Sequence, residues 1–296
     1  MEITIFFYYL CIMNITLIGA GNLATNLGKA LKAAQYHIGQ VYSRTETSAR
    51  QLGELLDCPW TSALSDLADD ADCFIISVKD NALEQVAEQV CRRFGNVTTQ
   101  QAGGQPANDR MQGNNHQQDT APIFLHTAGS MPMQLFEGRA RHYGVLYPMQ
   151  TFSKEREVDF SYIPCFVEAS DEATMAKICQ LARSISEEVH PMSSADRRYL
   201  HLAAVWACNF TNHCYDVASE ILGRHDIPFS VMNALVDETA AKVHALPPRQ
   251  AQTGPAVRFD ENVLESQMKL MEGELLQQEL YRKLSESIHE YQKKVK

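Results

Sequence analysis

Basic charge is scarce in this chain of 296 residues, and its scarcity excludes one large class of partners. The sequence carries 26 Lys and Arg against 36 Asp and Glu, which gives a formal net charge of -10 at pH 7. A nucleic-acid-binding surface needs a basic stripe or patch, and none offsets this acidic balance. We therefore expect no nucleic-acid partner.

Long apolar runs of the kind that cross a bilayer are also missing. The first 13 residues, MEITIFFYYLCIM, are apolar but too short to span a membrane. They have neither the basic start nor the small-residue cleavage site of a signal peptide. The segment is either an added strand or an upstream start, with Met13 as the alternative start, and the second interpretation is favoured. We expect no membrane association.

Paired cysteines are a third absence. The eight cysteines are scattered without a C-x-x-C pair or a framework spacing, and no cluster of residues has metal-ligand spacing. Most of them have apolar neighbours, as Cys73 does before Phe74, Ile75 and Ile76. This pattern is typical of buried, reduced thiols in a cytoplasmic protein that holds no metal.

The most informative feature that is present is a glycine turn between a strand and a helix. Residues 14–31 read NITLIGAGNLATNLGKAL, in which Gly19, Gly21 and Ala24 form G-x-G-x-x-A. Gly19 permits a tight turn, Gly21 lets the backbone approach a pyrophosphate, and Ala24 allows close helix–strand packing. The free N–H groups of the first turn, at Asn22 and Leu23, would face the anion. The pattern predicts dinucleotide binding, and an ordinary strand-to-helix turn is the alternative.

The end of the second expected strand, residues 37–42, bears on which dinucleotide binds. An NAD site usually has Asp or Glu there to hold the ribose 2′-hydroxyl, but this strand ends in Ser43, Arg44 and Thr45. Arg44 offers a planar cation for a 2′-phosphate, and the two hydroxyls can donate to it. One hydroxyl could instead only cap the next helix while Arg44 is solvated. Because the two roles are compatible, the sequence favours NADP over NAD.

Further cofactor contacts are expected where two later strands end. The run 72–78, DCFIISV, is typical of a strand buried on both faces of a parallel sheet, and Ser77, Val78 and Lys79 should line the cofactor. Asp80 or Asn81 could instead only cap the following helix. The next strand ends in HTAGS, and its Thr127 and Ala128 are small enough for a nicotinamide ring to approach.

The remaining pattern divides the chain into two domains. Residues 1–192 read as a Rossmann-type α/β domain with a mostly parallel sheet, including the possible extension 1–13 and a Gln/Asn-rich flexible insertion over 96–121. Residues 193–296 read as an all-helical domain, with helices expected over 197–222, 229–245 and 261–291.

Three residues are candidates for chemistry. His201 and Asn209 share one face of the expected helix 197–222, and a histidine suits proton transfer because its side chain titrates near neutrality. Both could equally be hydrogen-bonded groups in a domain or dimer interface. Ser130 follows the strand that ends in HTAGS, at the edge of the sheet where α/β proteins bind ligands, and it could contact substrate or cap the next segment.

The assembled motifs resemble a known family. GAGNLA, SRT, IISVKDNAL, HTAGS, YPMQTFS, LHLAAVWACNF and TGPAVRFD follow one another in its order. The family consists of Rossmann-like NADP oxidoreductases with a C-terminal helical domain of unknown function, similar in plan to pyrroline-5-carboxylate reductase and the deazaflavin-dependent NADP oxidoreductases. The resemblance implies an NADP-binding domain, a helical domain that pairs two subunits, and a cleft between domains. The insertion and Lys79, where related sequences tend to have proline, depart from it.

Two functional hypotheses follow. In the first, the protein is an NADP-dependent oxidoreductase that moves hydride to or from a small carbonyl or imine substrate, with His201 as proton donor and Asn209 orienting the substrate. In the second, it is a non-catalytic, NADP-binding, redox-sensing homodimer. Val205 favours the second slightly, because related hydroxyacid dehydrogenases carry a lysine one turn before the asparagine.

Overall fold

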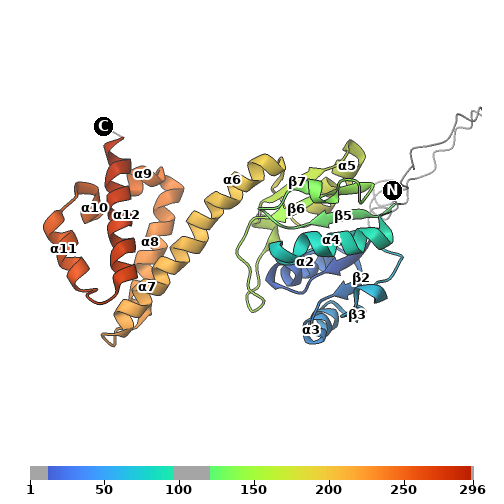
Figure 1. The fold of residues 1–296 in the computed structure, drawn as a ribbon, viewed down its shortest axis with the longest axis horizontal. Helices are drawn as coiled ribbons and strands as arrows, with labels where there is room; N and C mark the ends of the chain where they lie inside the picture. Colours follow the sequence, from blue (N-terminus) through green and yellow to red (C-terminus); the bar gives the residue numbers. More distant parts are fainter. Residues whose placement is uncertain (1–12, 96–120, 295–296) are drawn as a thin grey trace, which may run out of the picture. The chain divides into compact units, whose positions relative to one another are not determined.

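The structure of the chain is a computed structural model that describes residues 13–95 and 121–294 (Figure 1). It divides into two compact units, Met1–Cys208 and Asn209–Lys296, and each is described by itself. The expectations for the N-terminal extension and for the insertion lie outside the described residues, apart from Met13 and Ala121 at their edges. The division into domains at residue 192 stays a prediction.

The first unit is built on one sheet of eight strands. Its order is β3-β2-β1-β4-β5-β6-β7-β8, and every neighbouring pair is parallel except β6 and β7. This is the mostly parallel, Rossmann-type sheet that the sequence predicts. The strands are β1 (Asn14–Ile18), β2 (His37–Tyr42), β3 (Trp60–Thr61), β4 (Cys73–Ile76), β5 (Ile123–His126), β6 (His142–Pro148), β7 (Cys165–Ala169) and β8 (Val189–Pro191).

Helices cover both faces of this sheet because side chains of successive strand residues point to opposite faces. Ile15 and Leu17 of β1 join one core with α2 (Asn22–Ala33), α3 (Glu46–Leu56) and α5 (Glu172–Arg183). Phe74 and Ile76 of β4 join a second core with α4 (Asp80–Phe94). All five strand positions of β1 are buried or half-buried, which explains its nearly continuous apolar sequence.

Short 3-10 helices form several of the connections that follow strands. The acidic stretch 65–70 forms only the 3-10 turn η1 (Leu64–Asp66). Two other 3-10 turns, η2 (Met133–Phe136) and η3 (Phe160–Tyr162), follow β5 and β6. The helix that begins at residue 194 starts as α6 (Ser194–Ala204) and continues as the π-helical segment η4 (Val205–Phe210), and the first unit ends within η4, at Cys208.

The described part of the second unit contains helices and no strand, as predicted. They are α7 (Thr211–Gly223), η5 (Phe229–Met232), α8 (Asn233–Ala245), α9 (Pro248–Ala251), α10 (Pro255–Arg258), α11 (Glu261–Lys269) and α12 (Leu275–Lys293). The single helix expected over 261–291 is wrong, because Gly273 adopts a φ of 94° between α11 and α12. That left-handed backbone suits glycine and ends a helix.

Candidate active site

The first glycine of the turn is held against the neighbouring strand end. Gly19 has a φ of 122°, and a Cβ there would collide with the carbonyl oxygen of Ser77. Its N–H donates to the Tyr42 carbonyl at 2.7 Å. The ends of β1, β2 and β4 therefore meet around residue 19. Only glycine can occupy this position without backbone strain or a steric clash.

The second glycine opens toward solvent. Gly21 is the N-cap of α2, and a Cβ there would meet nothing within 4 Å. The first turn of α2 has no acidic residue, and Ala24 inside it is fully buried. The N–H groups of Asn22 and Leu23 lie in this turn, where the positive end of the helix favours an anion. This arrangement fits a pyrophosphate.

The loop after β6 braces the same turn, which the sequence did not indicate. The Asn22 side chain donates to the Phe152 carbonyl at 2.8 Å, and the buried Asn26 donates to the Ser153 carbonyl at 3.1 Å. The TFS part of YPMQTFS is thus tied to the start of α2, although 127 residues or more separate the paired positions.

The end of β2 presents a cation. Arg44 is exposed, and among the residues that the structure describes it forms no ion pair. Thr45 occupies the N-cap position of α3, but its hydroxyl makes no capping bond and instead donates to the Ser48 hydroxyl at 2.8 Å. Ser43 is half-buried beside them. Thr45 therefore has the position of a helix cap without its hydrogen bond. The exposed Arg44 can reach an anion.

The ends of β4 and β5 are joined by their hydroxyl side chains. Thr127 donates to the Ser77 hydroxyl at 3.1 Å, and Val78 lies beside Gly19. Ala128 is half-buried at the same edge, where the carboxyl ends of parallel strands meet. Lys79 is the N-cap of α4 and is exposed. These predicted cofactor residues therefore lie around one sheet edge.

Ser130 bonds to the carboxylate of Asp80. Its hydroxyl donates to Oδ2 of Asp80, which lies in the first turn of α4. Neither residue acts as a helix cap: the N-cap of α4 is Lys79, without a side-chain capping bond, and the N-cap of the next helix, η2, is Pro132. Asp80 instead holds Ser130 in place. Ser130 is half-buried, so its hydroxyl stays within reach of solvent.

His201 is paired with a tyrosine that the sequence reasoning did not single out. The Tyr147 hydroxyl lies 3.2 Å from Nδ1 of His201, and the two rings meet edge to face with centroids 6.1 Å apart. Gly129 lies directly beneath them: a Cβ at residue 129 would be 2.6 Å from Nδ1 and 2.8 Å from Cζ of Tyr147. The signals in the sequence were the glycine of HTAGS and the tyrosine that ends β6.

A buried charge network anchors α6 to the sheet. The Arg197 side chain is 1% exposed and donates to Oε2 of Glu168 and to the Met131 carbonyl, both at 2.7 Å. Ser194 donates to both carboxylate oxygens of Glu168, from its N–H at 2.9 Å and its hydroxyl at 2.5 Å. Arg197 and His201 are four residues apart on one face of α6. The network that anchors Arg197 to the sheet therefore also fixes the position of His201 on this helix.

Burial changes the acid–base behaviour of two groups near this edge. Burial raises the pKa of Tyr147, with Asp80 adding to the rise and Arg197 opposing it. Burial and the Arg197 charge lower the pKa of His126 to about 3. Nδ1 of His126 accepts from the Ala128 N–H at 3.2 Å, so Nε2 carries the proton. The Pro132 backbone raises the pKa of His126 by less than burial and Arg197 lower it. Nε2 of His126 has no hydrogen-bond partner at full bonding distance.

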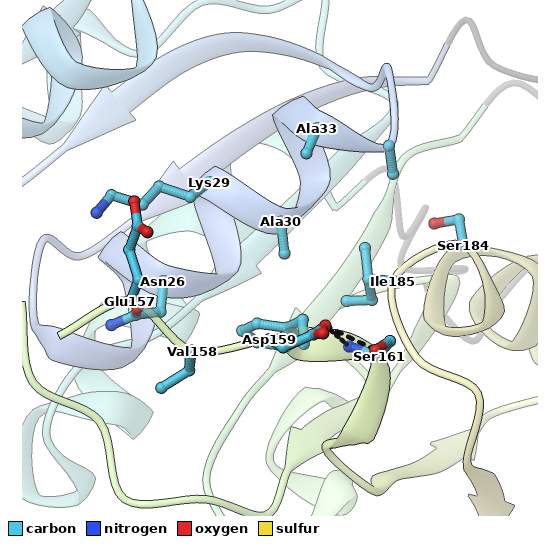
Figure 2. A pocket seen from close by; sticks show the side chains of 12 residues that line it. Asn26, Lys29, Ala30, Ala33, Glu157, Val158, Asp159, Ser161, Ser184 and Ile185 are labelled. Carbon is cyan, nitrogen blue, oxygen red and sulfur yellow. Dashed lines mark hydrogen bonds between the residues drawn. The ribbon is translucent and has the colours of Figure 1, made fainter.

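Asn209 lies in a different unit of the chain from His201. It opens the second unit and is exposed, so its predicted partnership with His201 stays a prediction. A hollow of about 670 Å³ in the first unit lies elsewhere, between α2, residues 157–161 and residues 184–185 (Figure 2). None of the predicted site residues lines it. Its charged residues, Lys29, Glu157 and Asp159, form the solvent-facing rim of an open surface.

Two further features are absent from the described residues. No group of three or more His, Cys, Asp or Glu side chains there could hold a metal ion. No helix within 13–95 and 121–294 combines the length and apolar character needed to cross a membrane.

Two family models match the chain. Residues 14–96 match the model described as "NADP oxidoreductase coenzyme F420-dependent", and residues 163–288 match "Domain of unknown function (DUF2520)". A comparison with proteins of curated function finds no match.

Solved structures resemble the chain over nearly its whole length. A protein of Bacteroides fragilis named "putative NADP oxidoreductase" is 45% identical, with a TM-score of 0.83 over 94% of this chain and 98% of its own. An imine reductase from Myxococcus stipitatus, in complex with NADP+, is 14% identical, with a TM-score of 0.58 over 95% of this chain and 93% of its own. A pyrroline-5-carboxylate reductase from Coxiella burnetii is 16% identical, with a TM-score of 0.53 over 95% and 98%. The last two show a shared fold.

Proposed function

The chain belongs to the family of NADP oxidoreductases that carry a DUF2520 domain after the nucleotide-binding domain, and we propose that it reduces or forms a small carbonyl or imine compound. It is an NADP-dependent oxidoreductase. What the proposal adds is the substrate class and the residues that act. The observation that carries it is the pairing of His201 with Tyr147 at the carboxyl edge of the sheet.

The residues at the glycine turn fit NADP. The space open above Gly21 and the first N–H groups of α2 would receive the pyrophosphate, and Arg44 with Ser43 and Thr45 would hold the 2′-phosphate. Ser77, Val78 and Lys79, together with Thr127 and Ala128, would border the nicotinamide half of the cofactor. The bound cofactor supplies or accepts the hydride.

His201 would supply the proton that reduction requires. When a substrate carbon receives hydride, its oxygen or nitrogen gains an electron pair and takes one proton, here from the imidazolium of His201. In the oxidative direction the neutral ring takes that proton back. Ser130, held by Asp80, would orient the polar end of the substrate, and Asn209 is a second candidate for that task. The His201 side chain is half-buried, so part of its ring is open to a substrate.

One experiment tests the cofactor and the chemistry together. Purified full-length protein is titrated with NADPH and NADH, and oxidation of NADPH is then followed with a panel of cyclic imines and small carbonyl compounds. We expect tighter binding of NADPH, turnover of at least one panel member, and loss of about 10²- to 10⁴-fold in kcat for His201→Gln with NADPH binding retained. Preference for NADH, or His201→Gln turning over at the wild-type rate, would contradict the assignment.

The second unit supports a further part of the proposal, a homodimer. Of its described residues only Ala256, Leu264 and Ser285 are buried. Meanwhile its exposed apolar side chains include Phe210, Ile221, Val231, Leu235, Leu276 and Leu284. A helical unit of this size needs a larger apolar core for its own stability, and a second copy of the unit would cover these surfaces.

Sedimentation equilibrium tests the homodimer. A particle of twice the chain mass of 33.2 kDa is expected. Leu235→Glu, which changes a side chain 58% exposed on α8, should shift the protein toward monomer. Leu55→Glu, 48% exposed on α3 of the first unit, is the matched control and should leave the mass unchanged. A monomeric wild-type protein at micromolar concentration would contradict the proposal.

A cytoplasmic location completes the proposal. Cys73, Cys91, Cys165 and Cys179 are buried free thiols, and burial raises the pKa of Cys165 to about 11. Such thiols behave as small apolar side chains and suit a reducing compartment. Fractionation of cells that produce the native protein, with immunodetection, would place it.

A further inference from the structure

Tyr147 is buried in a small apolar cluster near the end of β6. It is 9% exposed, packs with Phe166 at a ring-centroid distance of 6.4 Å, and belongs to a cluster against which Leu200 of α6 packs. Gly129 closes its other side, because even a methyl group there would press on the ring. A hydroxyl held this rigidly beside Nδ1 of His201 presents one hydrogen-bonding group to one ring atom.

We propose that Tyr147 is a positioning residue, whose hydroxyl oxygen accepts a hydrogen bond from Nδ1–H of His201 and so leaves Nε2 as the ring atom that exchanges a proton with substrate. The inference rests on the function proposed for His201. It assigns a direction to the 3.2 Å contact and a task to each ring nitrogen. In histidines that act in catalysis, the hydrogen bond at one nitrogen sets the protonation of the other.

The surroundings favour a hydroxyl that stays protonated. The charged groups that face Tyr147 are Asp80 at the start of α4 and Arg197 on α6, and Arg197 is itself paired with Glu168 of β7. Burial and the charge of Asp80 raise the pKa of Tyr147 more than the charge of Arg197 lowers it, so this pKa lies above its ordinary value of 10. Tyr147 is therefore a poor proton source at neutral pH, but its oxygen remains a good acceptor. His201, and not Tyr147, is therefore the residue that donates the proton to the substrate.

Protons balance over one turnover under this assignment. During reduction the substrate carbon gains hydride from the bound cofactor, and the N–H bond at Nε2 of the imidazolium breaks as the substrate oxygen or nitrogen takes its proton. His201 is left neutral with its remaining proton on Nδ1, still donated to Tyr147. Tyr147 keeps its own proton throughout. Solvent then returns one proton to Nε2 before the next turnover.

Nitrogen-15 NMR of the histidine rings tests the assignment without any substrate. The full chain is labelled at histidine, and the His201 signals are identified by their loss in His201→Gln. When the His201 ring is neutral we expect the Nδ1–H tautomer in the wild-type protein, and the Nε2–H tautomer in Tyr147→Phe, which lacks the hydroxyl acceptor. Tyr143→Phe, which removes a half-buried hydroxyl from the same strand, should match the wild type. An Nε2–H tautomer in the wild type would overturn the proposal.

Kinetics with an active panel substrate provide the second measurement. Tyr147→Phe keeps the ring and should lower kcat about 10- to 100-fold, with KM for NADPH within about twofold of wild type, as expected when the orienting partner of a working imidazole is lost. An unchanged kcat in a variant that has changed its tautomer would also overturn the positioning role. Absence of turnover by the wild-type protein would instead contradict the proposed function, and the tautomer of His201 would still be measured.

Discussion

Gly129 backs directly onto the imidazole of His201, since a Cβ at residue 129 would lie 2.6 Å from Nδ1. Two elements limit the room for a side chain at residue 129, because Tyr147 belongs to β6 and His201 to α6. The small residue in HTAGS thus makes room for the side chains of Tyr147 and His201. From the sequence alone, the neighbouring Thr127 and Ala128 are expected to make room for the nicotinamide ring.

Gly129→Ala should therefore damage catalysis more than cofactor binding. The added methyl group pushes the two rings off their positions, and a shift of about 1 Å in a catalytic group costs about 10²-fold in rate. We expect kcat to fall by that order, while the Kd for NADPH changes less than threefold. Gly223→Ala is the control, because a Cβ there meets nothing within 4 Å. Wild-type turnover by Gly129→Ala would show that the pair is not catalytic.

Cofactor preference should depend on Arg44. Loss of a charged hydrogen bond to a phosphate costs about 1.5–3 kcal/mol, so Arg44→Ala should weaken NADPH binding about 10- to 100-fold. NADH, which has no 2′-phosphate, should bind this variant as it binds the wild type. The control is Arg50→Ala, which removes an exposed α3 arginine near Glu54. Fluorescence titration measures the dissociation constants of the wild type and both variants for each cofactor, and equal losses for both cofactors in Arg44→Ala would reject the assignment of Arg44.

The buried pair of Glu168 and Arg197 should matter far more to stability than a surface pair. Glu168→Gln leaves the 1%-exposed guanidinium without its counter-charge, and an uncompensated buried charge costs about 3–5 kcal/mol. Glu88→Gln breaks the exposed pair with Arg92, at a cost of about 1 kcal/mol or less. Urea unfolding of both variants compares the losses. A similar small loss in each would mean that water reaches Arg197.

The fold could be predicted because its signals are local. The glycine turn and the apolar run of β4 each follow from neighbouring residues, and the structure agrees with them. Ser193 caps α6 by accepting from the Asp196 N–H, as its type and position indicate. Errors arose where one residue changes the backbone, as Gly273 does between α11 and α12.

The candidate site could be predicted only in part because its contacts are non-local. The predicted residues at four strand ends meet because parallel strands share an edge, a rule that needs no coordinates. Tyr147 is 54 residues from His201, and Glu168 is 29 residues from Arg197. No periodicity links such positions. An arginine on an amphipathic helix reads as a solvated charge until the carboxylate that buries it is seen.

Acid stability should be governed in part by His126. Its pKa is 6.5 when unfolded and about 3 in the folded protein, where burial disfavours the charged ring. The unfolded chain therefore binds one more proton between these values, so stability is full above pH 6.5 and is lost as the pH falls toward 3. Well below pH 6.5 this loss amounts to about 1.4 kcal/mol for each pH unit. His126→Asn, whose side-chain oxygen can still accept from the Ala128 N–H, should remove that part of the slope. His37→Asn, at an exposed position of β2, should keep the wild-type slope. Free energies of unfolding in urea, measured from pH 7 to pH 4, decide the matter: parallel curves for wild type and His126→Asn would show that His126 gains its proton without unfolding the protein.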